Sequence, residues 1–429
     1  MPSTIMNTTR RSFLKRAAAI AGMPAIIPAS ALGRDGTTAP SNRIVVGGIG
    51  LGPRGRHILG CLLPHADAQF VAIADPQLER REIIRKTVNR HYGNEDCKTY
   101  RDLRELLSRD DIDAVLIATG DRWHAPASIL AAKAGKDIYC EKPCTMTIAE
   151  GRELDEAVTK HQRIFQAGTQ RRNVDNFQAA HALAHSGKLG KLHTLHAGIL
   201  VPSDHRPPLP GEPEPDPEVI DWNLWLGPSP SMPYNKRYVQ GQWRHQQGLT
   251  CGYNILEWGS HTLDLCQWAA GADDTAPVEY EAQGGTIHAR YANGMKLVMR
   301  LSGFSNEGEW LGLGSCPVRF EGDAGWVEVG DNGKIAVSDP SLLEKTPATM
   351  AGTNASKHVR QFLDCVKSRQ QPATHSGVTR HGHLACHAAA IAWKLGRKLR
   401  LNPDTETFEG DDEANRMAAT DRRAPWQNI

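Results

Sequence analysis

The sequence contains neither a long hydrophobic run nor a strong excess of charge of one sign. Its 50 basic and 48 acidic residues give a formal net charge of +2, which offers no electrostatic case for binding nucleic acid or an anionic membrane surface. The apolar run near the N-terminus, Ala17 to Ile27, is far shorter than the roughly twenty residues that span a bilayer. We therefore expect neither a nucleic-acid-binding protein nor a membrane anchor.

Closely paired cysteines are also absent. The nine cysteines are scattered from Cys61 to Cys386 with no CxxC pair, a pattern that fits neither a disulfide framework nor a metal site. We expect free, buried thiols and no bound metal.

Residues 1–31 carry the pattern of an export signal. The run Thr9-Arg10-Arg11-Ser12-Phe13-Leu14-Lys15 is a full twin-arginine pattern, and Ala29-Ser30-Ala31 is a small-residue cleavage site. We expect a signal peptide over 1–31, a linker over 32–42, and export to the periplasm by the twin-arginine machinery. This route carries folded proteins, often ones already loaded with a cofactor, so the pattern also indicates a tightly held cofactor. The roughly 400 residues that follow are enough for two domains.

A dinucleotide-binding motif opens the first of these domains. A predicted strand over 42–49 runs directly into Gly50-Leu51-Gly52-Pro53-Arg54-Gly55, and a helix is predicted from Arg56. In this setting the first glycine permits a tight turn, the second lets the backbone approach a pyrophosphate, and the third allows close helix–strand packing. The phosphates would lie at the helix N-terminus, where free N–H groups and the helix dipole favour an anion.

A second predicted strand ends in an acidic residue at the spacing expected for NAD. Asp75 follows the run Gln69–Ala74, twenty residues after Gly55, where a carboxylate accepts hydrogen bonds from the adenosine ribose. Because a carboxylate would repel the 2′-phosphate of NADP, we favour NAD. Arg80 and Arg81 follow closely and could receive such a phosphate, so NADP stays open.

Two further strands extend the pattern of a parallel βα array. The apolar run Ala114–Ala118 predicts a buried parallel strand, and Thr119-Gly120-Asp121-Arg122-Trp123-His124 stands at its carboxyl end. Another short run, Ile138–Cys140, ends in Glu141-Lys142-Pro143. Ligands of open α/β sheets bind outside the carboxyl ends of the strands, so Lys142 is predicted to face the cofactor. We assign residues 43–165 to an α/β Rossmann domain with a doubly wound parallel sheet.

In combination, motifs spread along the chain resemble the Gfo/Idh/MocA family, which includes glucose–fructose oxidoreductase and inositol dehydrogenases. The shared features are Gly50-Leu51-Gly52-Pro53-Arg54-Gly55, Asp75, His124, Glu141-Lys142-Pro143, Gly168-Thr169-Gln170 and Gly259-Ser260-His261-Thr262-Leu263-Asp264. Near the C-terminus, the run 408–415 resembles exported bacterial members of the family.

The resemblance implies a second α+β domain over residues 166–400, with an open-faced, mostly antiparallel sheet, and leaves a C-terminal tail over 401–429. Such a sheet often forms the oligomer interface in the family, so we expect a homodimer or homotetramer. The nicotinamide would lie in the cleft between the domains. The implied cofactor contacts are Gly50, Gly52, Pro53, Arg54, Gly55, Asp75, Thr119, Asp121, His124, Glu141, Lys142 and Gln170.

In the family, the lysine of the EKP motif acts with an aspartate and a histidine spaced D-x-x-x-H on a helix. The corresponding stretch here is Glu257-Trp258-Gly259-Ser260-His261, where glutamate replaces the aspartate. Spacing of i and i+4 places both side chains on one helical face. A histidine suits removal of a hydroxyl proton near neutral pH, and a lysine stabilises an alkoxide-like oxygen. The resemblance thus assigns His261 as the base, Glu257 as its supporting acid and Lys142 as the neighbouring charge.

Aromatic residues are concentrated around the same stretch, with five of the ten tryptophans between Trp222 and Trp268. Aromatic faces suit the C–H faces of sugar rings, although tryptophans more often fill cores, so we expect one or two to touch the substrate. The predicted substrate contacts are Arg171, Trp243, Arg244, Tyr253 and His261.

Two other features bear on the cleft. The proline-rich stretch Val201–Pro217 predicts an extended loop, which could be a lid or an arm onto a neighbouring subunit. Four histidines lack the carboxylate or cysteine partners of a metal site, and we interpret them as polar residues of a helix near the cleft: His375, His381, His383 and His387.

The sequence favours an exported oxidoreductase that transfers a hydride between a sugar or polyol hydroxyl and a tightly held NAD. Since the periplasm does not supply NAD freely, a second substrate would recycle the cofactor in place. A second hypothesis is a redox-neutral, NAD-dependent glycosidase, in which transient oxidation acidifies a neighbouring C–H and elimination cleaves the glycosidic bond. A third is a non-catalytic sugar-binding protein, which the change to Glu257 would suit.

Overall fold

The computed structural model describes residues 38–301, 310–343, 347, 349–350, 352 and 354–429. The predicted signal, 1–31, and the first part of the predicted linker lie outside these residues. Residues 1–43 and 44–429 are separate units. In the described part of the first unit, the turn η2 (Pro40–Asn42) precedes Arg43, whose side chain donates hydrogen bonds to the Thr38 carbonyl. Within the described ranges, we find no helix with the length and apolarity to cross a bilayer.

Six parallel strands form the first sheet, in the order β3-β2-β1-β4-β5-β6. This order is the one known for dinucleotide-binding sheets, and it confirms the predicted Rossmann domain. The strands are β1 (Ile44–Ile49), β2 (Ala68–Ala74), β3 (Lys98–Tyr100), β4 (Ala114–Ile117), β5 (Asp137–Cys140) and β6 (Phe165–Ala167). The sheet therefore runs two residues beyond the boundary placed at 165.

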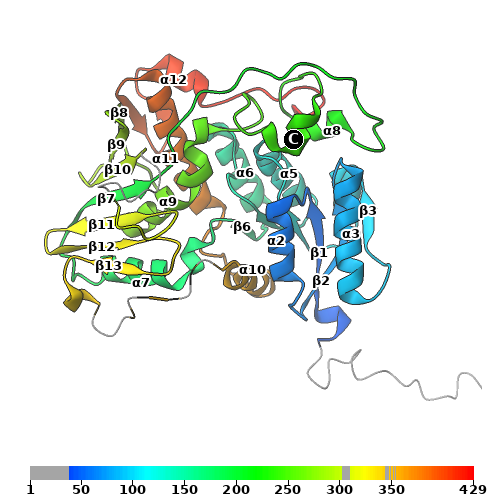
Figure 1. Cartoon of the computed structure of the whole chain (residues 1–429), viewed down its shortest axis with the longest axis horizontal. Coiled ribbons are helices and arrows are strands. Elements are labelled where there is room, and N and C mark those ends of the chain that lie inside the picture. The colour runs from blue at the N-terminus through cyan, green and yellow to red at the C-terminus, as the bar shows by residue number, and fades with distance from the viewer. Residues whose placement is uncertain (1–37, 302–309, 344–346, 348, 351, 353) are drawn as a thin grey trace, which may run out of the picture. The chain divides into compact units, whose positions relative to one another are not determined.

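Helices cover both faces of this sheet, as a doubly wound fold requires (Figure 1). One face packs against α2 (Pro53–Leu62), α3 (Leu78–Tyr92) and α10 (Ser356–Ser368). The other packs against α4 (Leu103–Leu107), α5 (Asp121–Lys133) and α6 (Ile148–Lys160). Since α10 comes from the last quarter of the chain, the C-terminal part contributes to the nucleotide-binding core.

The second sheet has the order β13-β12-β11-β7-β10-β9-β8-β14-β15, and only its β7–β10 pair is parallel among the described strands. It confirms the expected mostly antiparallel sheet. Its strands are β7 (Leu192–Gly198), β8 (Glu279–Gln283), β9 (Thr286–Arg290), β10 (Lys296–Arg300), β11 (Val318–Gly322), β12 (Gly325–Val329), β13 (Ile335–Val337), β14 (Leu399–Asn402) and β15 (Thr407–Phe408).

One face of the second sheet is covered by α7 (Asp175–His185), α9 (Ile255–Ala270) and α11 (Ser376–Leu395). Leu297 and Met299 of β10 alternate toward this buried face, whereas Lys296 of the same strand and His288 of the neighbouring β9 are exposed. The period-two alternation places one apolar row against the helices and leaves the opposite face open.

The end of the chain returns to the nucleotide-binding domain. The boundary placed at 400 falls inside β14, so the stretch predicted as a tail includes the last strands of the second sheet and α12 (Asp412–Met417). Beyond α12, the Trp426 ring packs edge-on against Trp123, with ring centroids 5.0 Å apart. The buried Trp426 side chain therefore attaches the polar segment after α12 to the nucleotide-binding domain.

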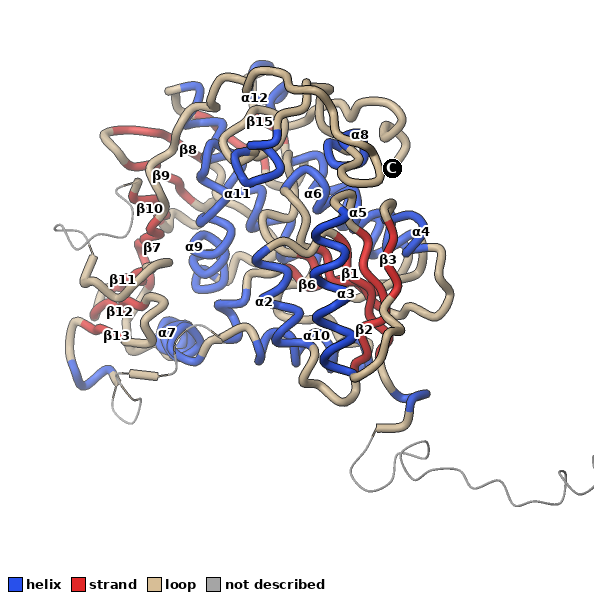
Figure 2. The backbone as a smooth tube through the Cα atoms, turned by 45° about the vertical axis from the view of Figure 1, so that its right-hand side comes forward, coloured by secondary structure: helices blue, strands red, loops and turns tan. Residues whose placement is uncertain are grey.

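A long segment joins β7 to α9, and we call its residues 200–250 the strap. It contains α8 (Trp222–Leu226) and a small core of its own, formed by Trp222, Trp225, Leu226, Tyr234, Tyr238, Val239 and Leu249. Figures 1 and 2 show α8 above the first sheet, near the C-terminus. The predicted extended loop, 201–217, forms the first part of the strap, and several of the clustered aromatics serve its packing.

Candidate functional site

The glycine motif forms a cradle at the carboxyl end of β1. Gly50 has φ +67°, and a Cβ there would lie 2.3 Å from Cγ2 of Thr119. A Cβ on Gly55 would lie 2.9 Å from that of Ala118, so only glycine allows the close approach of α2 to the sheet. No side chain caps α2 at Gly52, which leaves its first N–H groups available to an anion. The cradle fits the pyrophosphate of a dinucleotide.

Asp75 lies directly after β2, with its side chain almost fully buried. Its Oδ1 accepts a hydrogen bond from the backbone N–H of Gln77 at 2.9 Å. Burial raises the pKa of Asp75, and the nearby charges of Arg80 and Arg81 oppose this shift. The carboxylate stands where the adenosine ribose of NAD is expected.

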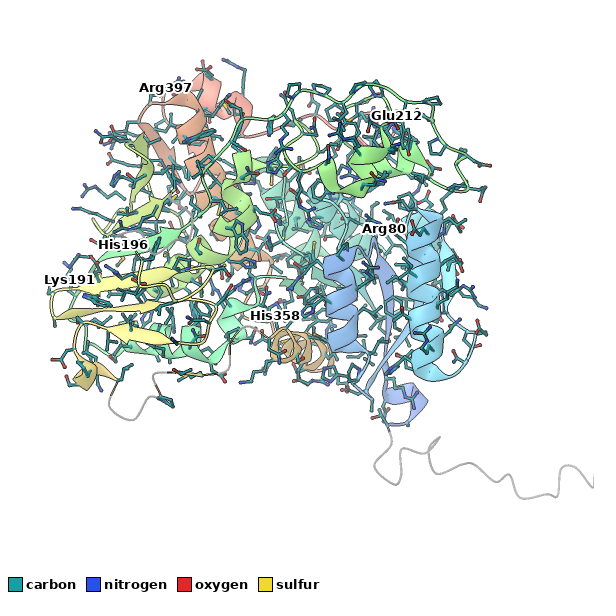
Figure 3. The ribbon with its side chains drawn as sticks, in the orientation of Figure 1. Arg80, Lys191, His196, Glu212, His358 and Arg397 are labelled. Carbon is teal, nitrogen blue, oxygen red and sulfur yellow. The ribbon has the colours of Figure 1, made fainter. Side chains whose placement is uncertain are left out.

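The two arginines after Asp75 have different partners. Arg81 donates to the carbonyls of Asp75 at 2.6 Å and Glu218 at 3.2 Å. Arg80, near the upper end of α3 in Figure 3, donates to the Val239 carbonyl at 3.3 Å. It also approaches within 3.3 Å of the position a Cβ on Gly52 would take. Arg80 is therefore the cation of this pair that adjoins the glycine motif.

The acid of the EKP motif joins three strand ends. Glu141 accepts a hydrogen bond from Nε of Arg54 at 3.0 Å, and its carboxylate packs against Gly168, where a Cβ would lie 2.8 Å away. With its amide oriented to satisfy both neighbours, Gln170 accepts from Nη2 of Arg54 at 2.6 Å and donates to the Gly168 carbonyl at 2.5 Å. These predicted residues thus form one network that links the ends of β1, β5 and β6.

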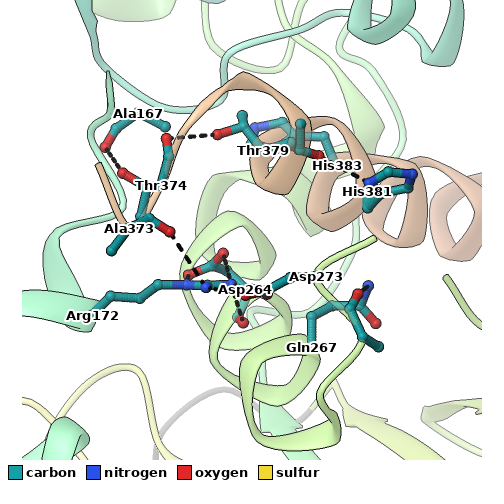
Figure 4. A network of polar contacts seen from close by, with 12 residues as sticks. Ala167, Arg172, Asp264, Gln267, Asp273, Ala373, Thr374, Thr379, His381 and His383 are labelled. Atoms are coloured by element: carbon teal, nitrogen blue, oxygen red, sulfur yellow. Dashed lines mark hydrogen bonds and ion pairs between the residues drawn. The ribbon is translucent and has the colours of Figure 1, made fainter. Parts of the chain in front are cut away.

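Buried histidines hold the backbone just after Lys142. Burial lowers the pKa of His124 to about 4, so the ring is neutral and its Nδ1 donates to the Pro143 carbonyl at 2.6 Å. His383 accepts from the Cys144 N–H at 3.0 Å, and its Nδ1 donates to the Thr379 carbonyl at 2.9 Å, as Figure 4 shows. Nε2 of His387 lies 3.1 Å from Oγ1 of Thr145.

Two of the four clustered histidines therefore have a definite structural task, which spacing alone did not identify. Of the described residues, no group of three His, Cys, Asp or Glu side chains is placed to bind a metal ion. The nine cysteines carry free thiols, eight of them buried.

Lys142 lies between the two domains. Its Nζ donates to the backbone carbonyl of Glu257 at 2.7 Å and lies 3.5 Å from Oε1 of the same residue. Glu257 belongs to the first turn of α9, so this contact crosses from the nucleotide-binding domain to the second domain. The structure thus places the Glu257 carboxylate beside Lys142.

His261 is one turn further along α9 and is 3% exposed. Its Nδ1 has no hydrogen-bond partner among the residues that the structure describes. Burial, together with the charges of Arg171 and Lys142, lowers the pKa of His261 well below its ordinary value. The ring is therefore neutral at physiological pH.

Asp121, the first residue of α5, adds a second carboxylate to this side of the cleft. Its Oδ2 accepts a hydrogen bond from Oγ1 of Thr250 at 2.9 Å. Burial, followed by the negative charge of Glu257, raises the pKa of Asp121 to about 6. We predicted Asp121 as a cofactor contact, whereas no local pattern pointed to Thr250, which is 129 residues away.

A buried ion pair sets the position of α9. Asp264, the acid at the end of the motif that contains His261, receives two hydrogen bonds of 2.9 Å from the Arg172 guanidinium. Arg172 also pairs with Asp273 at 2.7 Å (Figure 4). Since Arg172 lies in the turn η3 (Gln170–Asn173), the pair fastens the helix of His261 to the chain that follows β6.

The predicted substrate residues have different partners in the structure. The Arg171 guanidinium makes a two-fold ion pair with Asp331, at 2.7 and 3.1 Å. Arg244 stacks over the Trp243 ring at 4.5 Å within the strap, and Tyr253 stacks on His205, with centroids 4.7 Å apart. Of these residues, only Arg171 adjoins His261 by its electrostatic influence.

A cavity of about 350 Å³ lies near Tyr253, but Lys142 and His261 do not line it. Thr250 lines the cavity and donates a hydrogen bond to Asp121, so the cavity lies next to the residue that holds the Asp121 carboxyl. Arg122 lines it too, and its Nη1 lacks a partner among the described residues. This one unpaired N–H group on a buried arginine suits an anionic ligand.

Comparisons with known proteins agree with this geometry. Residues 43–169 match the model described as the oxidoreductase family's NAD-binding Rossmann fold, and residues 210–428 match that family's C-terminal alpha/beta domain. The chain is 32% identical over 170 residues to inositol 2-dehydrogenase of Pseudomonas fluorescens (strain SBW25), which covers 39% of this chain and 47% of the relative. It thus spans about half the length of that relative.

Two further likenesses bear on function and fold. Glycosyl hydrolase family 109 protein 1 of Shewanella sp. (strain MR-4) is 32% identical over 175 residues, covering 37% of this chain and 38% of that protein. The structure of the WlbA dehydrogenase from Chromobacterium violaceum, in complex with NADH and UDP-GlcNAcA, superposes with a TM-score of 0.62 at 17% identity. It covers 85% of this chain and 98% of that one, and at this identity the likeness shows the fold.

Proposed function

Because the chain belongs to the Gfo/Idh/MocA oxidoreductase family, we propose that it transfers a hydride between NAD and a hydroxyl-bearing carbon of a sugar or polyol. One observation carries the proposal: a neutral, buried histidine with an unpaired Nδ1 stands on the helix that also receives Lys142. A proton acceptor and a cation on facing domains are the two groups that oxidation of an alcohol requires from the protein.

The residues of the cradle would hold the cofactor. Gly50, Gly52 and the start of α2 suit its pyrophosphate, and Asp75 suits its adenosine ribose. NAD supplies the hydride acceptor when it is bound.

The reactive side would handle the proton and the charge on oxygen. His261 takes the hydroxyl proton, because its ring is neutral and Nδ1 is unpaired. Lys142 stabilises the negative charge that develops on the oxygen. Glu257 holds the Lys142 ammonium from the facing domain through its carbonyl, at 2.7 Å.

The same proposal includes the cellular location, the oligomeric state and the substrate class. The twin-arginine pattern supports export to the periplasm, and the open face of the second sheet supports assembly into a homodimer or homotetramer. The relative named inositol 2-dehydrogenase supports a polyol or sugar as the substrate.

A redox-neutral glycosidase is a second candidate, favoured by the identity to the protein named glycosyl hydrolase. Both activities would use Lys142 and His261, so these residues do not separate them. The contact of Lys142 with Glu257 favours a catalytic role over the third hypothesis, because the glutamate in place of the family aspartate still contacts the lysine.

A single-turnover experiment tests the choice. NAD-loaded protein is mixed with inositols, other polyols and aldoses, and the absorbance of reduced nicotinamide is followed. We expect reduction by at least one of them and none with His261→Asn. Cleavage of a nitrophenyl glycoside with no net reduction would establish the second candidate, and inertness toward both classes would contradict a catalytic role.

A further inference from the structure

The strap is attached to the nucleotide-binding domain at the carboxyl ends of its strands. These ends form the edge of the sheet on which a dinucleotide must lie. Figure 1 shows α8 above that edge.

Backbone pairing attaches the strap just after β2. The N–H of Leu78 donates to the Val219 carbonyl at 2.9 Å, and the N–H of Asp221 donates to the Pro76 carbonyl at 3.1 Å. Between them, Gln77 and Ile220 form an antiparallel bridge. The strap is therefore paired, backbone to backbone, with the residues that directly follow Asp75.

Side chains from the ends of β3 and β4 attach the same part of the strap. Arg101 pairs with Glu218 at 2.6 Å. Arg122 donates two hydrogen bonds to the Trp225 carbonyl, at 2.7 and 3.0 Å, and its guanidinium lies 3.7 Å from the centroid of the Trp225 ring.

The end of α8 is fitted closely to Trp123. The indole Nε1 of Trp123 donates to the Leu224 carbonyl at 2.9 Å. Gly227, with φ +57°, approaches the ring so closely that a Cβ would lie 2.2 Å from it. A side chain at this position would push α8 away from the nucleotide-binding domain.

Beneath α8 lies a small cavity beside Asp75. It is lined by Gly50, Ala74, Pro76, Thr119 and Leu224, so the strap and the ends of β1, β2 and β4 enclose it. A bound adenosine, with its ribose on Asp75 and its pyrophosphate at α2, would extend into this space. The cavity measures about 30 Å³, which is room for about one water molecule. Arg101, Asp102, Leu103 and Trp123 also line it, so an adenine ring could enter only if part of this wall moved outward, and Leu224 on α8 is the part that the strap contributes.

We infer that residues 218–227 of the strap form the outer wall of the adenosine half of the NAD site and control exchange of the cofactor. With the wall attached, bound NAD stays in place between turnovers. Arg122 connects the wall to the cradle, since its Nε and Nη2 bond the strap while Nη1 is left for the cofactor. The inference deepens the proposed function and rests on it, because retention matters when a second substrate must reoxidise the cofactor.

The first test adds one methyl group at Gly227, where it would collide with the Trp123 ring and loosen the wall. Gly227→Ala is loaded with NAD carrying a radioactive adenine, and its release is followed after a chase of unlabelled NAD. We expect release about ten-fold faster than from the wild type, since a docking contact of α8 is lost. Gly241→Ala is the matched control: it lies in the strap at φ +114°, with no atom within 4 Å of its Cβ position. Its release rate should stay within about two-fold of the wild type.

The second test locks the wall. Gln77→Cys combined with Ile220→Cys places two thiols on antiparallel bridge partners, whose Cα atoms lie about 4.5 Å apart in a pair of this kind, a separation that a disulfide can span. The oxidised apo form should fail to take up NAD, and the oxidised loaded form should fail to release it, until a reductant restores exchange. Gln77→Cys alone should exchange NAD normally under both conditions.

The outcomes separate the two proposals. Equal exchange rates for the oxidised and reduced double variant would overturn the inference, and so would wild-type release from a folded Gly227→Ala. If Gly227→Ala fails to fold, the cross-link decides. Neither measurement needs a substrate, so a failure to oxidise any polyol would contradict the proposed function alone.

Discussion

The two sides of the cofactor cleft treat their buried polar groups differently. On the cofactor side, Glu141, Arg54 and Gln170 satisfy one another, and His124 bonds a backbone carbonyl. On the reactive side, Nδ1 of His261 has no partner among the described residues, and the Lys142 and Glu257 charges stand 3.5 Å apart. The satisfied Glu141–Arg54–Gln170 network rigidifies the cofactor side, where Nη1 of Arg122 and Nε2 of His124 stay unpaired among the described residues; on the reactive side the unpaired atom belongs to the group proposed to take the substrate proton. The first side is built to hold and the second to react.

The largest effect should come from His261→Asn. This change removes the proton acceptor, and we expect turnover to fall about 10³-fold while NAD binding stays close to wild type. Single-turnover kinetics and NAD titration measure the two quantities. A comparable loss of NAD affinity would assign His261 to the cofactor side and break the comparison.

Lys142→Met should follow, with turnover lower by about 10²-fold because charge on the substrate oxygen is no longer stabilised. Lys142→Arg, which keeps the charge, is the matched control and should retain more activity. Equal losses in both variants would show that placement of the lysine, and not its charge, matters.

Asp75→Ser should act on the other side of the cleft. We expect NAD to bind about 30-fold more weakly, since a hydrogen bond to a charged group contributes about 2 kcal/mol, with turnover of the saturated enzyme nearly unchanged. Titration with NAD and NADP checks both. A fall in saturated turnover as large as that of Lys142→Met would erase the distinction between the sides.

Asp121→Asn should have the smallest effect on rate, less than about ten-fold, but a distinctive effect on stability. The folded-state pKa of Asp121 is raised to about 6, so its contribution to stability is complete at low pH and is lost as the pH rises from about 4 through 6. The variant should lack this pH dependence. Unfolding curves from pH 3 to 8 measure it, and parallel curves for the two proteins would contradict the burial of this carboxyl.

Local backbone chemistry made much of the cofactor side predictable. The roles of Gly50 and Gly55 depend on neighbours that any strand–turn–helix unit of this type contains, and the structure shows both close approaches. The parallel Rossmann sheet was predicted by the same reasoning, and the structure added its strand order.

Long-range partners escaped prediction. Cys144 and His383 are 239 residues apart, and Arg122 and Trp225 are 103 apart. No spacing rule connects such pairs, because their proximity arises from packing of whole elements. The strap was recognised only as an extended loop, with a lid or an arm left open, and the structure shows it on its own chain's nucleotide-binding domain.

The sequence by itself determined the dinucleotide-binding half, since glycines, a strand-end acid and apolar runs impose their geometry on nearby residues. It also determined that Glu257 and His261 share a helical face. Only the tertiary structure decided which residue the Glu257 carboxylate meets, because helical spacing sets a direction and the opposing domain supplies the partner. Packing turned that carboxylate toward Lys142 and left Nδ1 of His261 without a partner among the described residues.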